Sequence, residues 1–101
     1  MEPAIHIEQQ KLADYCRRHG IQKLSFFGSV LTADFGPDSD VDVLVEFKVG
    51  QVPGFLRLGQ MEEELSVILG GRKVDLVTLK ALNHRIRTTV LKQARVQYAE
   101  G

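Results

Sequence analysis

The sequence contains a single cysteine and no excess of charge of either sign. One thiol cannot form an intrachain disulfide, so Cys16 is typical of a protein from a reducing compartment. The 13 Lys and Arg residues balance the 13 Asp and Glu residues. Proteins that coat nucleic acids carry a clear basic excess, so we do not expect direct nucleic-acid binding.

Long apolar runs are also missing. No stretch approaches the ~20 apolar residues of a membrane-spanning helix. The first residues, MEPAIHIEQQKLADYC, lack the basic segment and apolar core of a signal peptide. With 101 residues and no internal repeat, we expect one domain over residues 1–101 that is soluble, cytoplasmic and free of membrane contact.

The spacing of apolar residues predicts alternating helices and strands. An amphipathic helix begins near Ile5 and ends at His19-Gly20, with Gly20 as a left-handed cap. Strands are predicted at 21–27, 41–47 and 73–79, and later helices at about 58–69 and 81–99. The almost continuously apolar 41–47 strand should be covered on both faces. This order predicts an α/β (α+β) fold, a small mixed β-sheet flanked by helices.

Three aspartates alternate within FFGSVLTADFGPDSDVDVLVEF, at Asp38, Asp40 and Asp42. Asp38 belongs to Gly36-Pro37-Asp38-Ser39, which is favourable turn chemistry. Asp40 and Asp42 instead enter a strand, where Asp is depleted. On one strand face they lie roughly 7 Å apart and repel by about 2 kcal/mol at an effective dielectric constant of ~20. A divalent cation would screen this pair.

Two common ion- and phosphate-binding loops are excluded. An EF-hand loop counted from Asp38 needs glycine at its sixth position and glutamate at its twelfth, where this chain has Val43 and Val49. A Walker loop needs Gly-Lys-Ser or Gly-Lys-Thr after Gly28-Ser29, and neither is present. The remaining hypothesis is a phosphate held by backbone N–H groups at Gly28-Ser29, next to Mg²⁺ held by Asp40 and Asp42.

A two-metal site requires a further acid on a neighbouring strand. Asp75 lies inside the apolar run KVDLV and fills this role in the hypothesis. The alternative is that Asp75 is a solvent-facing strand residue.

Together these residues resemble a known signature. Gly28-Ser29, followed about a dozen positions later by Asp40-x-Asp42 and a β-branched run, resembles the DNA polymerase beta-type nucleotidyltransferase superfamily. The shortness of the chain and its SDVDVLVEF wording are similar to the minimal nucleotidyltransferase (MNT) branch. The family often has Arg-Gly shortly after the Gly-Ser, where this chain has Thr32-Ala33.

The resemblance implies roles for individual residues. Asp40, Asp42 and Asp75 would be catalytic and would bind Mg²⁺, with two ions expected, and Asp75 would accept the proton of the attacking hydroxyl. Gly28 and Ser29 would hold the phosphates of the nucleotide.

The resemblance also implies a partner and a reaction. MNT proteins are antitoxins of HEPN-domain toxins, and characterised members transfer AMP from ATP to a tyrosine of the toxin. We therefore expect a protein adenylyltransferase in a hetero-oligomer with a HEPN toxin. Two alternatives stay open: an antitoxin that neutralises its toxin by binding alone, and a nucleotidyltransferase acting on a small molecule.

Overall fold

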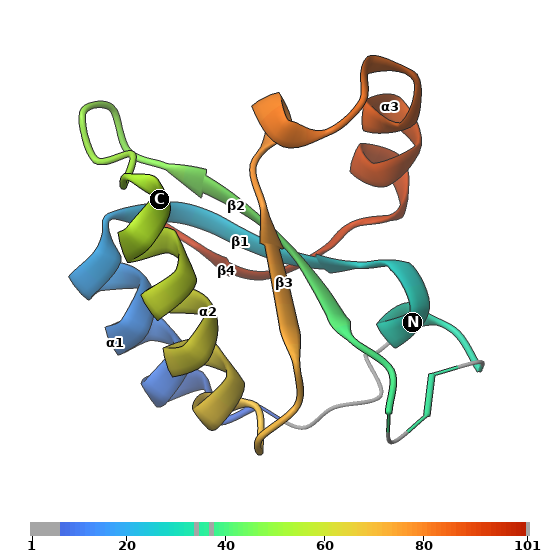
Figure 1. Cartoon of the computed structure of the whole chain (residues 1–101), viewed down its shortest axis with the longest axis horizontal. Coiled ribbons are helices and arrows are strands. Elements are labelled where there is room, and N and C mark those ends of the chain that lie inside the picture. Colours follow the sequence, from blue (N-terminus) through green and yellow to red (C-terminus); the bar gives the residue numbers. More distant parts are fainter. Residues whose placement is uncertain (1–6, 34, 37, 101) are drawn as a thin grey trace.

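The computed structural model describes residues 7–33, 35–36 and 38–100. Four strands form one sheet in the order β3-β2-β1-β4 (Figure 1). The strands are β1 (Ile21–Phe27), β2 (Val41–Phe47), β3 (Val74–Val77) and β4 (Arg95–Ala99). β1 is antiparallel to both β2 and β4, whereas β2 is parallel to β3. The sheet is therefore mixed, as predicted.

Helices lie on both faces of this sheet, which confirms the predicted fold class. They are α1 (Gln9–His19), α2 (Phe55–Ile68) and α3 (His84–Gln93), with short 3-10 helices η1 (Gly28–Leu31) and η2 (Leu79–Ala81). In Figure 1, α1 and α2 run side by side along one face, and α3 lies on the other side of the strands. None of the helices in the described ranges has both the length and the apolar character needed to cross a bilayer.

The alternation of β2 divides the core between the two faces. Val41, Val43 and Val45 are buried with α1 and α2 in the main cluster. Leu44 faces the other way and is buried with Leu82 and Val90 in a smaller cluster. Both faces of β2 are therefore covered, as its continuous apolar run predicts. Burial of such side chains contributes about 1.5–3 kcal/mol each.

The prediction of one helix over 81–99 is wrong. Helix α3 ends at Gln93, and the chain then forms β4, in which Tyr98 pairs with Leu24 of β1. Ala94 and Tyr98 lie four apart and so fit a helical stripe, but the run from Arg95 to Ala99 also fits a strand. Pairing with β1 makes this run a strand, because without β4 the backbone of β1 would form an open sheet edge.

Helix α1 ends as predicted. Gly20 has φ 68°, and its backbone N–H donates to the carbonyls of Cys16 and Arg17. The helix begins at Gln9, whereas the predicted start at Ile5 lies outside the described residues. Tyr15 fixes α1 to α2 by donating its hydroxyl to the carbonyl of Met61 at 2.9 Å.

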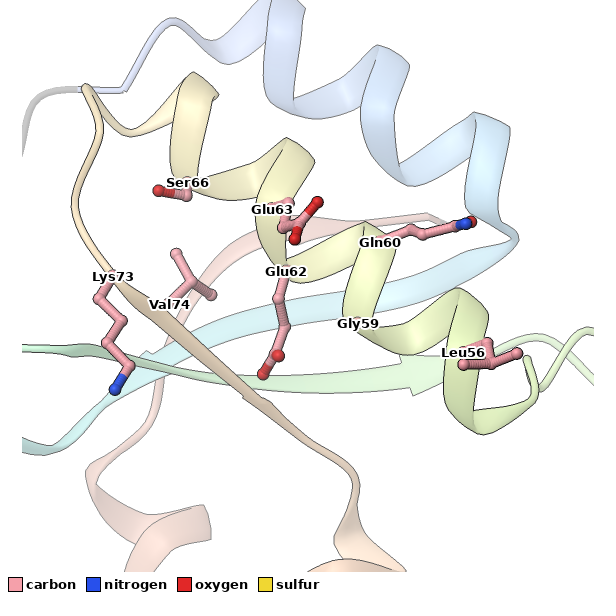
Figure 2. Close-up of a pocket in the computed structure, with 8 residues that line it drawn as sticks. All are labelled: Leu56, Gly59, Gln60, Glu62, Glu63, Ser66, Lys73 and Val74. Carbon is pink, nitrogen blue, oxygen red and sulfur yellow. The ribbon is translucent and has the colours of Figure 1, made fainter.

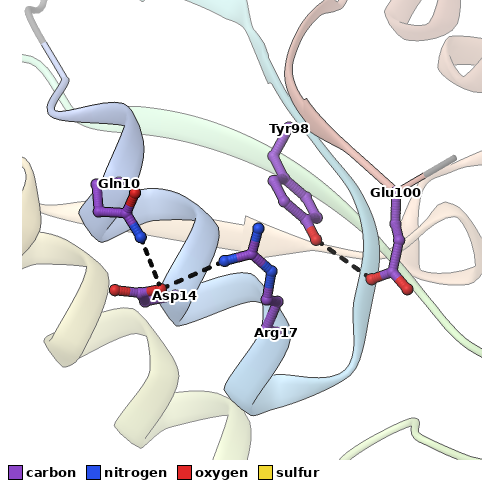
Figure 3. A network of polar contacts seen from close by, with 5 residues as sticks. All are labelled: Gln10, Asp14, Arg17, Tyr98 and Glu100. Carbon is purple, nitrogen blue, oxygen red and sulfur yellow. Dashed lines mark hydrogen bonds and ion pairs between the residues drawn. The ribbon is translucent and has the colours of Figure 1, made fainter.

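Polar contacts run along the exposed side of α1, next to the end of β4 (Figure 3). Asp14 accepts from Gln10 at 3.2 Å and from Arg17 at 3.4 Å. The hydroxyl of Tyr98 donates to Glu100 at 3.2 Å. These contacts are exposed or only partly buried, and such surface contacts contribute little to stability.

Candidate functional site

Asp42 and Asp75 lie opposite each other on neighbouring strands. They are register partners in the parallel pairing of β2 with β3. Asp42 is half-exposed and Asp75 is exposed. Desolvation raises the pKa of the Asp42 carboxyl, and the negative charges of Asp75 and Asp40 raise it further. The fold therefore brings the three predicted acids into electrostatic contact.

Asp40 is exposed just before β2 begins. Its Oδ2 lies 4.0 Å from Nζ of Lys73, and both side chains are well solvated, so the ion pair is weak. The backbone N–H of Val41 donates to the carbonyl of Lys73 at 2.8 Å. This bond joins the start of β2 to the residue that precedes β3.

Gly28 brings the turn after β1 against Asp42. Phe27, the last residue of β1, is the register partner of Asp42. Gly28 follows with φ 78°, a left-handed conformation that favours glycine. A methyl group built on Gly28 would collide with the carboxylate of Asp42. The position therefore requires glycine both for its backbone and for the close approach of the carboxylate.

The predicted helical turn after Gly28-Ser29 is present as η1. Thr32 closes it, since both its backbone N–H and its hydroxyl donate to the carbonyl of Ser29 at 2.9 Å. Ser29 itself is half-exposed. At the place where the MNT family often has arginine, this chain therefore has a side chain that stabilises the turn.

The turn before Asp40 also forms. Ser39 N–H donates to the carbonyl of Gly36 at 3.1 Å, and the hydroxyl of Ser39 accepts from the N–H of Gly36 at 3.0 Å. Asp38 is exposed, as expected of a turn residue, while Pro37 lies outside the described residues.

The predicted metal role of Asp40, Asp42 and Asp75 stays a prediction. In the described part of the chain, no three His, Cys, Asp or Glu side chains converge closely enough to hold a metal ion. The donor chemistry nevertheless fits Mg²⁺, which prefers oxygen ligands. The raised pKa of Asp42 also reflects negative charge that a bound cation would offset.

Two open cavities lie beside this site. One, of about 460 Å³, borders Asp40 and the start of β3, and the other, of about 350 Å³, borders Gly28 and the start of β4. Both fall within the size range of small-ligand sites. The first is lined by Asp38, Ser39, Asp40, Gly70, Gly71, Arg72 and Lys73. The second is lined by Gly28, Leu31, Thr32, Gln93 and Arg95. The sequence analysis missed Arg72, because its place beside the site depends on tertiary structure.

A third cavity, of about 650 Å³, lies between α2 and β3 (Figure 2). Glu62 reaches from α2 toward β3, where its Oε2 accepts from the backbone N–H of Leu76 at 2.8 Å. Because β3 is at the edge of the sheet, this carboxylate satisfies an edge amide that β2 does not. Glu62 therefore has a structural role in this cavity.

Comparison with known proteins identifies the family of this chain. The family described as polymerase beta nucleotidyltransferase matches residues 10–100. Protein adenylyltransferase MntA of Thermococcus cleftensis is 40% identical over 76 residues, which cover 75% of this chain and 74% of that protein.

Two solved structures share the fold. A toxin–antitoxin structure with AMP-PNP has a TM-score of 0.74 at 20% identity and covers 93% of this chain and 75% of its own. A complex of tri-AMPylated Shewanella oneidensis HEPN toxin with MNT antitoxin has a TM-score of 0.65 at 19% identity. The match covers 91% of this chain and 70% of the matched chain. Because the family match spans almost the whole sequence, this chain belongs to the polymerase beta nucleotidyltransferase family.

Proposed function

We propose that this chain is the adenylyltransferase antitoxin of a HEPN toxin, and that it transfers AMP from ATP to a tyrosine of that toxin. One observation carries the proposal: Asp42 pairs with Asp75 and contacts Gly28 in a chain 40% identical to a named protein adenylyltransferase. The tri-AMPylated toxin and the AMP-PNP complex among the structural neighbours support the partner and ATP as the substrate.

The reaction is a displacement at phosphorus. The tyrosine oxygen attacks the α-phosphorus of ATP and forms a new P–O bond. The bond between that phosphorus and the oxygen that bridges to the β-phosphorus breaks. Pyrophosphate departs, AMP remains on the tyrosine, and the hydroxyl proton passes to the carboxylate of Asp75. Asp75 is exposed, so an acceptor on a second protein can reach it.

The remaining residues bind and orient the nucleotide. Gly28 and Ser29 would hold the phosphates through their backbone N–H groups, since their turn lies against the Asp42 carboxylate. Mg²⁺ held by Asp40, Asp42 and Asp75 would neutralise charge on the triphosphate and on the departing pyrophosphate. Such positioning and electrostatic stabilisation supply most of the catalysis in this class of reaction.

Mass spectrometry of the partner tests the proposal. After incubation with this protein, ATP and Mg²⁺, the HEPN toxin should gain the mass of one or more AMP groups, mapped to tyrosine. The toxin should also stay inactive after the two proteins are separated, because the modification is covalent. An unmodified toxin that regains activity on separation would refute the proposal.

The second candidate is an antitoxin that acts by binding alone. The observation in its favour is that no three acids converge on a metal position in the described residues, together with the structural use of Thr32. In this case the Asp40→Asn/Asp42→Asn variant would protect as well as the wild type, and only at one antitoxin per toxin. The transferase proposal expects this variant to lose protection when it is substoichiometric.

A further inference from the structure

Arg72 forms two contacts with the segment that leads into the acidic site. Its guanidinium lies 4.6 Å from the centre of the Phe35 ring, in a cation–π contact. Nη1 of the same group donates to the carbonyl of Gly36 at 3.1 Å. Arg72 is half-buried, so both contacts are partly shielded from water.

The main chain of Arg72 is fixed at the same time. Its carbonyl accepts from the hydroxyl of Ser66 on α2 at 2.5 Å. The next residue, Lys73, accepts from the N–H of Val41 at the start of β2. Asp75 follows two residues later on β3. Arg72 thus belongs to a segment that is hydrogen-bonded to both α2 and β2 and that carries one of the three acids.

The contact with Gly36 continues toward the other two acids. The carbonyl of Gly36 accepts from both Arg72 and the N–H of Ser39, each at 3.1 Å. Asp40 is the residue after Ser39, and Asp42 lies two further on. A short series of hydrogen bonds therefore connects Arg72 to the start of the Asp-x-Asp motif.

We propose that Arg72 is a positioning residue that fixes Asp40 and Asp42 relative to Asp75. It does so by holding Phe35 and Gly36 against the chain that enters β3. The inference rests on the proposed function, since it assigns Arg72 a role in the same reaction. Arginine suits this role because its planar guanidinium stacks on a ring while donating in its own plane, which the ammonium of lysine cannot do.

Kinetics of AMP transfer test the role at a temperature where every variant is folded. Arg72→Ala should lower kcat by about tenfold to a hundredfold, the cost of displacing catalytic groups by roughly 1 Å. KM for ATP should change less than about threefold, because Gly28 and Ser29 still hold the phosphates. Arg72→Ala should also lower the melting temperature. Compared with Arg72→Ala, Arg72→Lys should restore more of the melting temperature than of kcat. Arg57→Ala, which removes an exposed cation from the first turn of α2, is the control and should match the wild type.

A double-mutant cycle separates positioning from a general effect of charge. Phe35→Leu removes the stacking partner and should lower kcat less than Arg72→Ala does. If Arg72 acts through this segment, the double variant should be no slower than Arg72→Ala alone. Additive losses, or an Arg72→Ala variant with the kcat of the wild type, would overturn the inference.

Hydrogen exchange distinguishes failure of this inference from failure of the proposed function. In Arg72→Ala, the amides of Ser39 and Val41 should exchange at least about tenfold faster, while the amide of Val43 in the centre of β2 stays protected. Unchanged exchange at Ser39 and Val41 overturns the inference even if the wild type transfers no AMP. A wild type that transfers no AMP overturns the proposed function, and with it the role of Arg72 in that reaction.

Discussion

Asp42 of β2 and Asp75 of β3 are paired across the parallel part of the sheet, and Gly28 closes on the same Asp42 carboxylate from the end of β1. Three strands thus meet at one carboxylate. The arrangement depends on strand register, because a slip of one residue would turn Asp42 toward α1 and α2. The alternation of side chains along β2 that buries Val41 and Val43 on one face therefore places Asp42 on the opposite face.

Gly28→Ala should destabilise the protein and abolish AMP transfer. Alanine at φ 78° costs about 1–2 kcal/mol, and its methyl group would in addition displace the carboxylate of Asp42. Denaturant unfolding and the AMP-transfer assay measure the two effects. Gly50→Ala is the matched control, because Gly50 has the same φ but open space around it. Equal activity in the two variants would contradict the role given to Gly28.

Asp40→Asn/Asp42→Asn should abolish AMP transfer without destabilising the fold in metal-free buffer. The substitutions remove like-charge repulsion of at most about 2 kcal/mol, which solvent reduces at these partly exposed positions. Thermal unfolding should give an equal or slightly higher melting temperature. A large fall would mean that the two carboxylates hold the fold together. Glu63→Gln, which removes one negative charge at an exposed position on α2, controls for half of the change in net charge.

The stability of the protein should fall as the pH rises above about 9. Burial raises the pKa of the Cys16 thiol from 9.0 to about 12. The pKa of the Tyr15 hydroxyl is also raised, mainly by burial and to a smaller extent by the negative charge of Glu64. Between pH 9 and 12 the unfolded chain loses the thiol proton and the folded chain keeps it, so alkali favours unfolding. For one such group, the free energy of unfolding falls by up to about 1.4 kcal/mol per pH unit.

Denaturant unfolding at pH 8, 9 and 10 checks this dependence (roughly the range over which an unfolded thiol titrates). Cys16→Ala should be less stable at pH 8, because it leaves a cavity, but its stability should fall less steeply with pH. Equal slopes for the two proteins would contradict the assignment. The native thiol should also react slowly with a disulfide reagent at pH 8 and rapidly once the chain is unfolded.

Glu62→Ala should cost about 1 kcal/mol in the free energy of unfolding, since it removes the acceptor of the Leu76 amide at the sheet edge. Glu63→Ala makes the same change of charge and helix propensity at the next, exposed position and should be nearly neutral. Denaturant titrations of both variants measure the difference. Similar losses would show that the bond from Leu76 to Glu62 adds nothing.

Much of the fold could be predicted from local pattern. The bounds of β1 and β2 and the left-handed cap at Gly20 match the sequence prediction, because apolar runs and glycine act on nearby backbone. β4 could not be predicted in this way. Its residues fit a helix locally, and only pairing with β1, some 70 residues away, makes them a strand.

Some residues of the candidate site could also be predicted from the sequence, and others could not. The alternation of Asp40 and Asp42, and the place of Asp75 on another strand, were visible in the sequence. Arg72 was not, since it contacts Gly36 across 36 positions in a segment without a recognisable motif. Thr32 was visible only as a departure from the family, and the structure gives it a role in closing η1.

The central claim is that this chain is a catalyst, and turnover tests it most directly. A small fraction of one equivalent of the antitoxin should, with ATP and Mg²⁺, convert all of its HEPN partner to the AMP-modified form, as measured by intact-protein mass. The same amount of the Asp40→Asn/Asp42→Asn variant should leave the mass unchanged. A partner that keeps its mass with the wild type, and is protected only at one antitoxin per toxin, would contradict the account.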